Sequence, residues 1–281
     1  MCRPHPPPSY HARCGYLPGC CAKSLLTQPE VFRLEVDRGE AIALDWYPGH
    51  SPSPAVLFIP GLGSQRRGEK ARCFAAGFVA EGRAFASLDL RGHGDSDGAV
   101  RDLTMSRMLA DVSVAAAWLA AQAGTSRIVL IGASMGAALA AWHAARHPES
   151  IAALVLLAPA LGFPTALVRT LDRAALTRWR SSGAHRLRSE WIDVELGRAL
   201  LDDAAHYDAG ELTRTLATRA LLIHGMRDQT IPWEHSVDFV RTQRRTAADL
   251  HLVAAGDHRL TDQRELLFAL FSAWLAQSGR G

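Results

Sequence analysis

The residue of this 281-residue chain best placed to do chemistry is Ser134, which lies between two glycines in Gly132-Ala133-Ser134-Met135-Gly136. An apolar run at 128–131 precedes this segment, and an alanine-rich stretch at 137–145 follows it. A G-x-S-x-G sequence between a strand and a helix forms a sharp turn that exposes the serine hydroxyl, because its glycines fit where side chains would clash. The first N–H groups of the helix also favour negative charge there. We therefore predict that Ser134 is a nucleophile and that Gly132 and Gly136 permit the turn.

A serine hydroxyl is a weak nucleophile near neutral pH, so it needs a general base and a carboxylate that orients the base. Asp228 and His258 each follow an apolar, strand-like run. Both therefore fall on loops at the sheet edge that carries Ser134, and the order serine, acid, histidine suits a nucleophile on such a turn. We predict a triad of Ser134, Asp228 and His258. Asp257 is the alternative acid, but as the sequence neighbour of His258 it is poorly placed to approach the imidazole ring.

Attack of the serine on a carbonyl produces an oxyanion, which is stabilised by N–H donors that are already oriented. The residue after the nucleophile supplies one such donor, here Met135. The second is expected from the loop that follows an apolar run at 55–59, where Leu62 lies between Gly61 and Gly63. The glycines let the backbone turn its N–H groups inward. We predict that the N–H groups of Leu62 and Met135 form an oxyanion hole.

Further features of the sequence bear on other kinds of chemistry. The polar segment 89–96 is interpreted as a buried loop beneath the site. His143 and His147 are spaced as i and i+4 but lack the glutamate of a zinc protease, so we interpret them as favouring the negative end of their helix. The sequences G-x-G-x-x-G and G-x-x-x-x-G-K-[ST] are absent, which excludes dinucleotide and P-loop sites of these types. We predict no metal and no cofactor.

Composition and charge exclude several classes of protein. With 48% hydrophobic residues, the chain can bury one large core. The net charge of +3 comes from residues 1–29, which contain Arg3, Arg13 and Lys23 and no acid. Removing these three from the 31 lysines and arginines leaves 28, equal to the 28 aspartates and glutamates. A balanced body lacks the basic surface that nucleic acids require, and no apolar run reaches the ~18 residues of a membrane span.

Residues 1–29 are predicted to be a disordered leader. This segment is rich in proline and holds four of the five cysteines, and Cys73 is the fifth. Such a distribution indicates no disulfide framework in the folded body and favours a reducing compartment. The leader also lacks the apolar region of a secretory signal. We therefore predict a cytoplasmic protein, with organelle targeting by residues 1–29 as the alternative because the leader contains no acid.

The elements that must position these residues follow from alternating apolar and helical patterns. A hairpin is predicted at 32–36 and 41–47. Further strands are predicted at 55–59, 83–88, 128–131, 151–157, 220–224 and 250–253, and helices at 70–80, 104–121, 137–145, 233–242 and 262–275. This alternation predicts an α/β fold, with a mostly parallel sheet covered by helices on both faces and entered through an antiparallel hairpin. Ligands bind such sheets beyond the carboxyl ends of the strands, where the glycine-rich turns fall.

Residues 161–217, here named the cap segment, interrupt the alternation. They show a helical pattern without a strand-like run, so we predict a small helical cap inserted into a core of residues 30–160 and 218–278. The first half of the cap segment is basic and the second half acidic. The basic half contains Arg169, Arg173, Arg178, Arg180, Arg186 and Arg188. We interpret the charges as ion pairs within the cap and solvated faces. Binding of an anionic substrate by the arginines is the alternative.

Taken together, these residues resemble the α/β-hydrolase superfamily over about residues 30–278. The segments that carry the resemblance are 60–63, 89–96, 132–136, 224–233 and 256–258. Segment 224–233, together with Asp257-His258-Arg259, is similar to one branch, which includes a mitochondrial protein depalmitoylase and acyl-glucuronide esterase together with bacterial relatives. The resemblance implies the α/β-hydrolase fold and a serine esterase or thioesterase. The leader has no counterpart in the family, and the family's caps vary too much to imply a substrate.

The sequence thus predicts a serine hydrolase that cleaves carboxylic ester or thioester bonds of small or acyl substrates through an acyl-enzyme. The expected partner is a small-molecule ester or thioester, and the sequence specifies no oligomeric state. One alternative is a hydrolase of carbon–carbon bonds, or a perhydrolase, with the same triad. Another is a non-catalytic ligand-binding protein on the same fold, although the complete set of Ser134, Asp228 and His258 argues against it.

Overall fold

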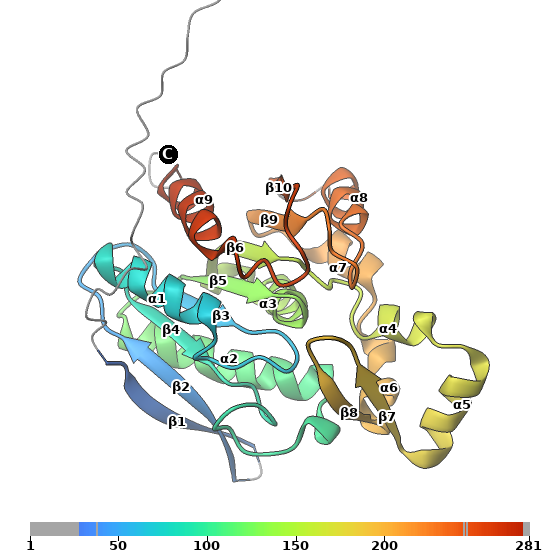
Figure 1. The fold of residues 1–281 in the computed structure, drawn as a ribbon. Coiled ribbons are helices and arrows are strands. Elements are labelled where there is room, and N and C mark those ends of the chain that lie inside the picture. Colours follow the sequence, from blue (N-terminus) through green and yellow to red (C-terminus); the bar gives the residue numbers. More distant parts are fainter. Residues whose placement is uncertain (1–27, 38, 244, 246, 278–281) are drawn as a thin grey trace, which may run out of the picture.

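The computed structural model describes residues 28–37, 39–243, 245 and 247–277 (Figure 1). An eight-stranded sheet with strand order β1-β2-β4-β3-β5-β6-β9-β10 forms its centre. β1 pairs antiparallel with β2 and β2 with β4, whereas every later pair in this order is parallel. The predicted mostly parallel sheet with an N-terminal hairpin is therefore confirmed. The strands are β1 (Glu30–Asp37), β2 (Glu40–Tyr47), β3 (Val56–Ile59), β4 (Phe85–Leu88), β5 (Ile128–Ala133), β6 (Ile151–Leu157), β9 (Ala220–Gly225) and β10 (Ala248–Val253).

The predicted leader, residues 1–29, lies outside the described residues except for its last two positions. Its predicted disorder and its four cysteines therefore lie outside them as well. Cys73 is described and is buried in α1 (Glu69–Ala80). Among the described helices, none combines the length and apolarity needed to cross a bilayer.

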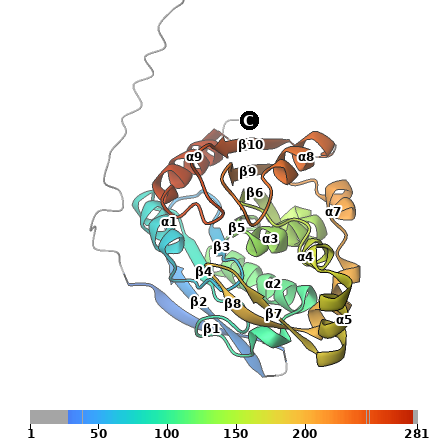
Figure 2. The same ribbon diagram turned by 45° about the vertical axis from the view of Figure 1, so that its right-hand side comes forward.

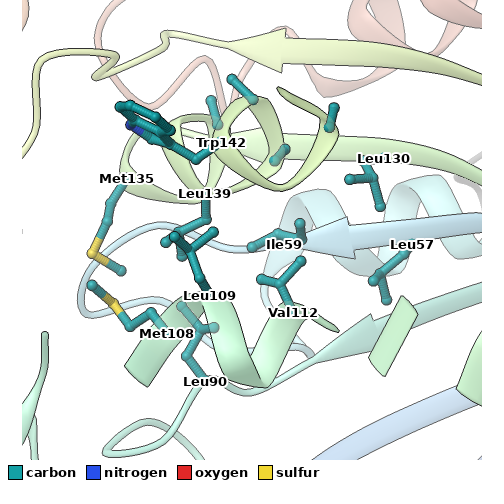
Figure 3. Close-up of a cluster of buried hydrophobic side chains, with 14 of the residues drawn as sticks. Leu57, Ile59, Leu90, Met108, Leu109, Val112, Leu130, Met135, Leu139 and Trp142 are labelled. Carbon is teal, nitrogen blue, oxygen red and sulfur yellow. The ribbon is translucent and has the colours of Figure 1, made fainter. Parts of the chain in front are cut away.

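Helices cover both faces of the sheet (Figure 2). The buried clusters place α1 and α9 (Arg264–Gln277) on one face, and α2 (Met105–Gln122), α3 (Met135–Arg146) and α8 (Glu234–Thr242) on the other. Strand β3 shows why two layers form, because alternate side chains of a strand point to opposite faces. Val56 and Phe58 join the cluster of α1 and α9, whereas Leu57 and Ile59 join the cluster of α2 and α3 (Figure 3).

Helix α2 illustrates how local sequence sets an element. Thr104 precedes it, and the Thr104 hydroxyl accepts a hydrogen bond from the Arg107 N–H at 3.0 Å, so an otherwise unpaired donor at the helix start is satisfied. Met108, Val112 and Leu119 share one stripe of the helix and are completely buried (Figure 3 shows the first two). That stripe packs α2 against the sheet beside α3.

The cap segment contains a hairpin that its sequence pattern did not predict. Its elements are α4 (Thr165–Thr170), α5 (Arg173–Ser182), β7 (Ala184–Arg188), β8 (Asp193–Gly197), α6 (Arg198–Asp203) and α7 (Ala209–Thr215). The helices agree with the helical pattern, but the expectation of no strand is wrong, because β7 and β8 pair antiparallel. This hairpin and α4–α6 lie to the right of the sheet in Figure 1. Three 3₁₀ turns, Val100–Asp102, Pro148–Ser150 and Ala204–His206, complete the elements of the described residues.

The polar segment 89–96 is the predicted buried loop only in its first half, because Gly94 and Asp95 are exposed. Asp89, Arg91 and His93 are all buried. The Asp89 carboxylate forms an ion pair with the buried guanidinium of Arg66, which also donates to Asp45 at 2.8 Å. Because these buried charges are paired, their desolvation is compensated by charge-assisted hydrogen bonds. The segment therefore ties the loop after β4 to the loop after β3, on which Leu62 lies.

Candidate active site

Ser134 occupies the turn between β5 and α3, with φ 53° and ψ −116°. A positive φ is strained for a residue with a side chain, and such strain is found where a structure fixes a functional group. A Cβ at Gly132 would collide with the backbone of Gly136 and Ala137, and one at Gly136 would collide with the carbonyl oxygens of Ile59 and Pro60. Both glycines are therefore required by close backbone approach, which is the arrangement that the sequence predicts.

His258 connects Ser134 to Asp228. Its Nε2 lies 3.0 Å from the Ser134 Oγ, and its Nδ1 lies 2.7 Å from the Asp228 Oδ2. A carboxylate can only accept, so Nδ1 carries the ring proton and donates it to Asp228. The neutral ring then presents the Nε2 lone pair to the Ser134 hydroxyl, as a general base requires. The structure thus brings together the three side chains that were predicted to act jointly. Asp228 and His258 reach Ser134 from the loops after β9 and β10.

Four donors surround the Asp228 carboxylate. Its Oδ1 accepts the backbone N–H groups of Thr230 and Ile231, each at 2.8 Å, and its Oδ2 accepts from His258 and from the Nε2 of His224 at 2.9 Å. Burial opposes ionisation, but the hydrogen bonds from His224, His258 and the Ile231 backbone outweigh it and hold the pKa of Asp228 well below its usual range. Asp228 is therefore a carboxylate in a rigid position.

His224 was not singled out as a functional residue by the sequence analysis. Its imidazole is fully buried, and its Nδ1 lies 2.7 Å from the Ser236 Oγ on α8. Because Nε2 faces two acceptors, Asp228 and the Ile231 carbonyl, it must be the protonated nitrogen, and Nδ1 accepts the Ser236 hydroxyl proton. The only hint in the sequence is a polar residue at the end of an apolar strand, four residues before Asp228.

Asp257, the alternative acid, makes a different contact. Its Oδ1 accepts the Leu260 N–H at 2.7 Å, in the turn that follows His258. The position that orients the His258 ring is taken by Asp228. The geometry therefore favours Asp228 over Asp257 as the carboxylate partner of His258.

The two predicted oxyanion donors both line the cavity beside Ser134. Met135 is the first residue of α3, so its N–H has no acceptor within the helix. Within the described chain, the Leu62 N–H has no protein acceptor. A Cβ built on Gly61 would lie 3.0 Å from the Ala133 carbonyl oxygen and 3.2 Å from the Ser134 Cβ, so the Leu62 loop packs directly against the serine turn. Both N–H groups are free to meet an anionic oxygen.

A cavity of about 970 Å³ opens beside Ser134 and His258. Apolar side chains of the core and the cap segment dominate its wall: Leu62, Phe163, Leu167, Leu187, Ile192, Ile231 and Phe239. The tip of the β7–β8 hairpin contributes to its rim, where Trp191 is 49% exposed and stacks with the Arg259 guanidinium, 4.8 Å from the ring centre. A mostly apolar cavity of this size suits an acyl chain or another extended apolar group.

The cap arginines occupy two kinds of position, one that fits ion pairing within the cap and one that faces the cavity. Arg186 donates to both oxygens of Asp193 at 2.6 Å, which is the predicted pairing within the cap. Arg169 instead lines the cavity. On the cavity wall it is accompanied by Lys70, whose Nζ donates to the Arg259 carbonyl at 2.5 Å and whose pKa is lowered to about 8 by burial and by the nearby Arg259 charge. Two cationic side chains, Arg169 and Lys70, therefore lie on the cavity wall beside the site.

The interpretation of His143 and His147 as cations at a helix end is corrected by the structure for His143. That ring is buried, and burial, with smaller contributions from His147 and Arg146, lowers its pKa to about 4. His143 is therefore neutral near pH 7. Its ring packs beside His147 at 4.8 Å between centroids, and its Nδ1 lies 3.3 Å from the Ser113 Oγ on α2. In the described residues, no group of three His, Cys, Asp or Glu side chains could hold a metal ion.

The fold, with a serine on a strand–turn–helix at the carboxyl edge of the sheet, is that of an α/β-hydrolase. Residues 50–196, slightly more than half of the chain, match the family described as serine aminopeptidase, S33, and the chain belongs to this family. The resemblance inferred from the sequence is therefore confirmed at the level of the superfamily and of its esterase and thioesterase members.

Individual relatives and solved structures are similar to this chain at low sequence identity. The Bos taurus protein named palmitoyl-protein thioesterase ABHD10, mitochondrial, is 25% identical over 223 residues, which are 78% of this chain and 72% of the relative. The structure of alpha/beta hydrolase domain-containing protein 10 from mouse has a TM-score of 0.75 at 23% identity, over 88% of this chain and 99% of its own. Est1E from Butyrivibrio proteoclasticus, bound to ferulic acid, has a TM-score of 0.78 at 20% identity, over 89% of this chain and 100% of its own. These structural similarities establish the fold.

Proposed function

We propose that the protein is a serine hydrolase that cleaves carboxylic esters or thioesters through an acyl-enzyme. The observation that carries this proposal is the continuous hydrogen-bonded chain from Ser134 through His258 to Asp228. The free N–H groups beside Ser134 and the apolar cavity that opens onto it support the same assignment. In this proposal, residues 161–217 form a cap on a core of residues 30–160 and 218–278.

The first half-reaction acylates the serine. His258 Nε2 removes the hydroxyl proton while the Ser134 Oγ attacks the carbonyl carbon, and the electron pair of the C=O bond moves onto its oxygen. The N–H groups of Leu62 and Met135 hold this oxyanion. When the tetrahedral intermediate collapses, the bond to the alcohol or thiol breaks, and His258 returns its proton to the leaving group. Asp228 stabilises the imidazolium that forms in between.

The second half-reaction releases the acid. Water attacks the acyl carbonyl while His258 Nε2 takes one of its protons, and a second oxyanion forms in the same place. Collapse of this intermediate breaks the bond to the Ser134 Oγ, which recovers its proton from His258. The products are a carboxylic acid and the free enzyme, so no redox partner or metal is needed to balance the reaction.

The ester and thioester classes are supported by the relatives as well as by the cavity. The bovine relative is named a palmitoyl-protein thioesterase, and the Est1E structure contains ferulic acid, which is an aromatic carboxylic acid. Both names refer to acyl groups with large apolar parts. The apolar wall of the cavity here suits such groups. The cellular location stays a proposal, cytoplasmic or organellar, because the relative is mitochondrial and residues 1–27 lie outside the described chain.

The proposal is tested with p-nitrophenyl esters and S-acyl thiol analogues. Wild-type protein should release p-nitrophenol and should be labelled by a fluorophosphonate, whereas Ser134→Ala should lose both by ~10³-fold or more. Ser150→Ala is a matched control, because Ser150 only donates to the His147 carbonyl on the surface. Equal rates for wild type and Ser134→Ala would remove Ser134 as the nucleophile.

Two rival functions predict different outcomes in the same assay. A carbon–carbon hydrolase would prefer β-diketones to esters, and a perhydrolase would need peroxide to form its product. A ligand-binding protein without turnover would neither hydrolyse any member of the panel nor react with the fluorophosphonate. The geometry of His258 against Ser134 disfavours this last rival, because the base is already within hydrogen-bond reach of the hydroxyl.

A further inference from the structure

Strand β4 and the segment after it are bonded to the loop that carries Leu62. The Asp89 carboxylate accepts the Arg66 N–H at 2.6 Å, and the Ser87 hydroxyl donates to the Arg66 carbonyl at 2.9 Å. A third bond joins the Gly63 N–H to the Nε2 of His93 at 3.0 Å. The first two bonds act on Arg66, four residues beyond Leu62, whereas the third acts on the residue directly after Leu62.

The neighbours of His93 define its protonation. Its Nδ1 lies 3.2 Å from the Arg91 carbonyl oxygen, which can only accept a hydrogen bond, so Nδ1 carries the proton. Nε2 of the neutral ring then has a free lone pair and accepts the Gly63 N–H. The ring is buried, and burial lowers the pKa of His93 although the Arg91 carbonyl and the nearby Asp89 favour its charged form. The acceptor state is therefore the stable state near pH 7.

The residue that orients His93 is itself firmly held. Arg91 is 1% exposed, its backbone N–H donates to one oxygen of Asp111 at 2.9 Å, and its Nε donates to the other at 2.6 Å. Asp111 lies on α2, in the core. The Arg91 carbonyl, and with it the His93 ring, is thus fixed to a rigid helix rather than to a free loop.

We propose that His93 is a positioning residue for the oxyanion hole. By accepting the Gly63 N–H, it fixes the peptide unit between Leu62 and Gly63, which shares the Leu62 Cα with the peptide unit whose N–H is the proposed donor. Gly63 allows this geometry with a φ of +71°. Such a donor stabilises a developing charge only when it is oriented beforehand. The inference rests on the proposed hydrolase function, and it assigns the buried His93 of segment 89–96 a positioning role in that reaction.

The test compares His93→Leu with His93→Gln. Leucine fills the site but leaves the Gly63 N–H without an acceptor, whereas the glutamine amide oxygen can reach the position of Nε2. We expect His93→Leu to lower kcat by about 10- to 100-fold with a change in KM below about threefold, because loosening one donor costs part of the ~10²–10³ that its loss costs. His93→Gln should recover most of kcat. If His93→Leu does not fold, His93→Asn is used instead, because asparagine is too short to reach the Gly63 N–H.

A second measurement separates positioning from general stability. A trifluoromethyl ketone forms an anionic adduct with the serine, so its inhibition constant should rise in His93→Leu by the factor by which kcat/KM falls. Ser87→Ala, which removes a buried bond to the same loop at Arg66, should keep kcat and ketone affinity near the wild-type values even where Tm falls.

The inference is overturned if folded His93→Leu turns over within twofold of wild type, or if Ser87→Ala loses as much activity as His93→Leu. Wild-type turnover that is abolished in Ser134→Ala shows that the hydrolase proposal holds independently. Absence of wild-type turnover on the whole panel would instead contradict the hydrolase proposal itself.

Discussion

At the scale of single residues, Asp228 shows how a buried carboxylate is kept charged and still. Two backbone N–H groups hold Oδ1, and two imidazoles hold Oδ2. Removing one of these four donors leaves three hydrogen bonds to the carboxylate. Changing the carboxylate itself alters all four hydrogen bonds. An amide at this position would turn an NH₂ or an oxygen toward His258, and only the oxygen could keep Nδ1 as the protonated nitrogen.

We therefore expect Asp228→Asn to lower kcat by ~10⁴, the cost known for a triad whose histidine takes the wrong tautomer. Steady-state rates with a p-nitrophenyl ester measure this loss, and circular dichroism checks that the variant is folded. Asp257→Asn is the matched control, because it changes the neighbouring acid, which accepts the Leu260 N–H in a turn. A kcat for Asp257→Asn as low as that for Asp228→Asn would reverse the choice between the two acids.

At the scale of elements, the site depends on how closely α3 approaches the loop after β3. Gly136 lies in the first turn of α3, where a Cβ would strike the carbonyl oxygens of Ile59 and Pro60. The same approach brings the loop with Leu62 against the serine turn. The contact that packs α3 against the loop after β3 therefore also places the proposed oxyanion donors.

Gly136→Ala should lower the free energy of unfolding by about 1–3 kcal/mol, as overpacking does, and should also lower kcat because the two donors move apart. Urea unfolding and ester hydrolysis measure the two effects. Gly124→Ala is the comparison variant: its φ of +60° makes alanine strained, but its Cβ would meet nothing within 4 Å and it lies far from Ser134 in the fold. It should lose stability while keeping kcat, and a normal kcat in Gly136→Ala would contradict the coupling.

How far the sequence predicts this molecule differs between elements. Strands β5, β6 and β9 are continuous apolar runs because both of their faces are covered, and such runs are readable without a structure. Each strand of the β7–β8 hairpin has only five residues, several of them charged, and Arg186 and Asp193 recognise each other across the two strands. A pairing between strands leaves no periodic trace in a pattern this short, so the segment resembles a polar helix.

The same reasoning applies to the site. Ser134, Asp228 and His258 stand in turns after strands, and their order follows the topology of the sheet. The structure brings the three side chains into hydrogen-bond contact, while their catalytic roles stay a prediction. His224 and His93 could not be inferred, because their partners, Ser236 on α8 and Gly63 on the β3 loop, lie in elements whose packing the sequence does not specify.

At the scale of the whole molecule, the buried neutral His143 makes stability depend on pH. The folded pKa of His143 is about 4, below its ordinary value of 6.5. The unfolded chain therefore binds more protons between these values. The stability that His143 provides is complete above about pH 6.5 and is lost as the pH falls toward its folded pKa.

We expect the free energy of unfolding of wild type to fall between pH 6.5 and about 4, with His143 contributing about 3 kcal/mol to the total at ~1.4 kcal/mol per pKa unit. His143→Gln, which keeps a polar partner for Ser113, should have a shallower dependence by up to one proton. Urea titrations at a series of pH values measure both slopes. His251→Gln is the exposed control on β10, and identical slopes for wild type and His143→Gln would show that His143 does not titrate as inferred.

The tip of the β7–β8 hairpin touches two loops that come from opposite ends of the chain. Ile192 packs against Gly63, 2.8 Å from where a Cβ would stand, and Trp191 stacks on Arg259, the residue after His258. The four-residue turn 189–192, inserted between β6 and β9, thus borders the cavity in which the proposed nucleophile meets its proposed base, without supplying either. Substitutions in this turn would therefore reshape the rim of the cavity while leaving Ser134 and His258 in place.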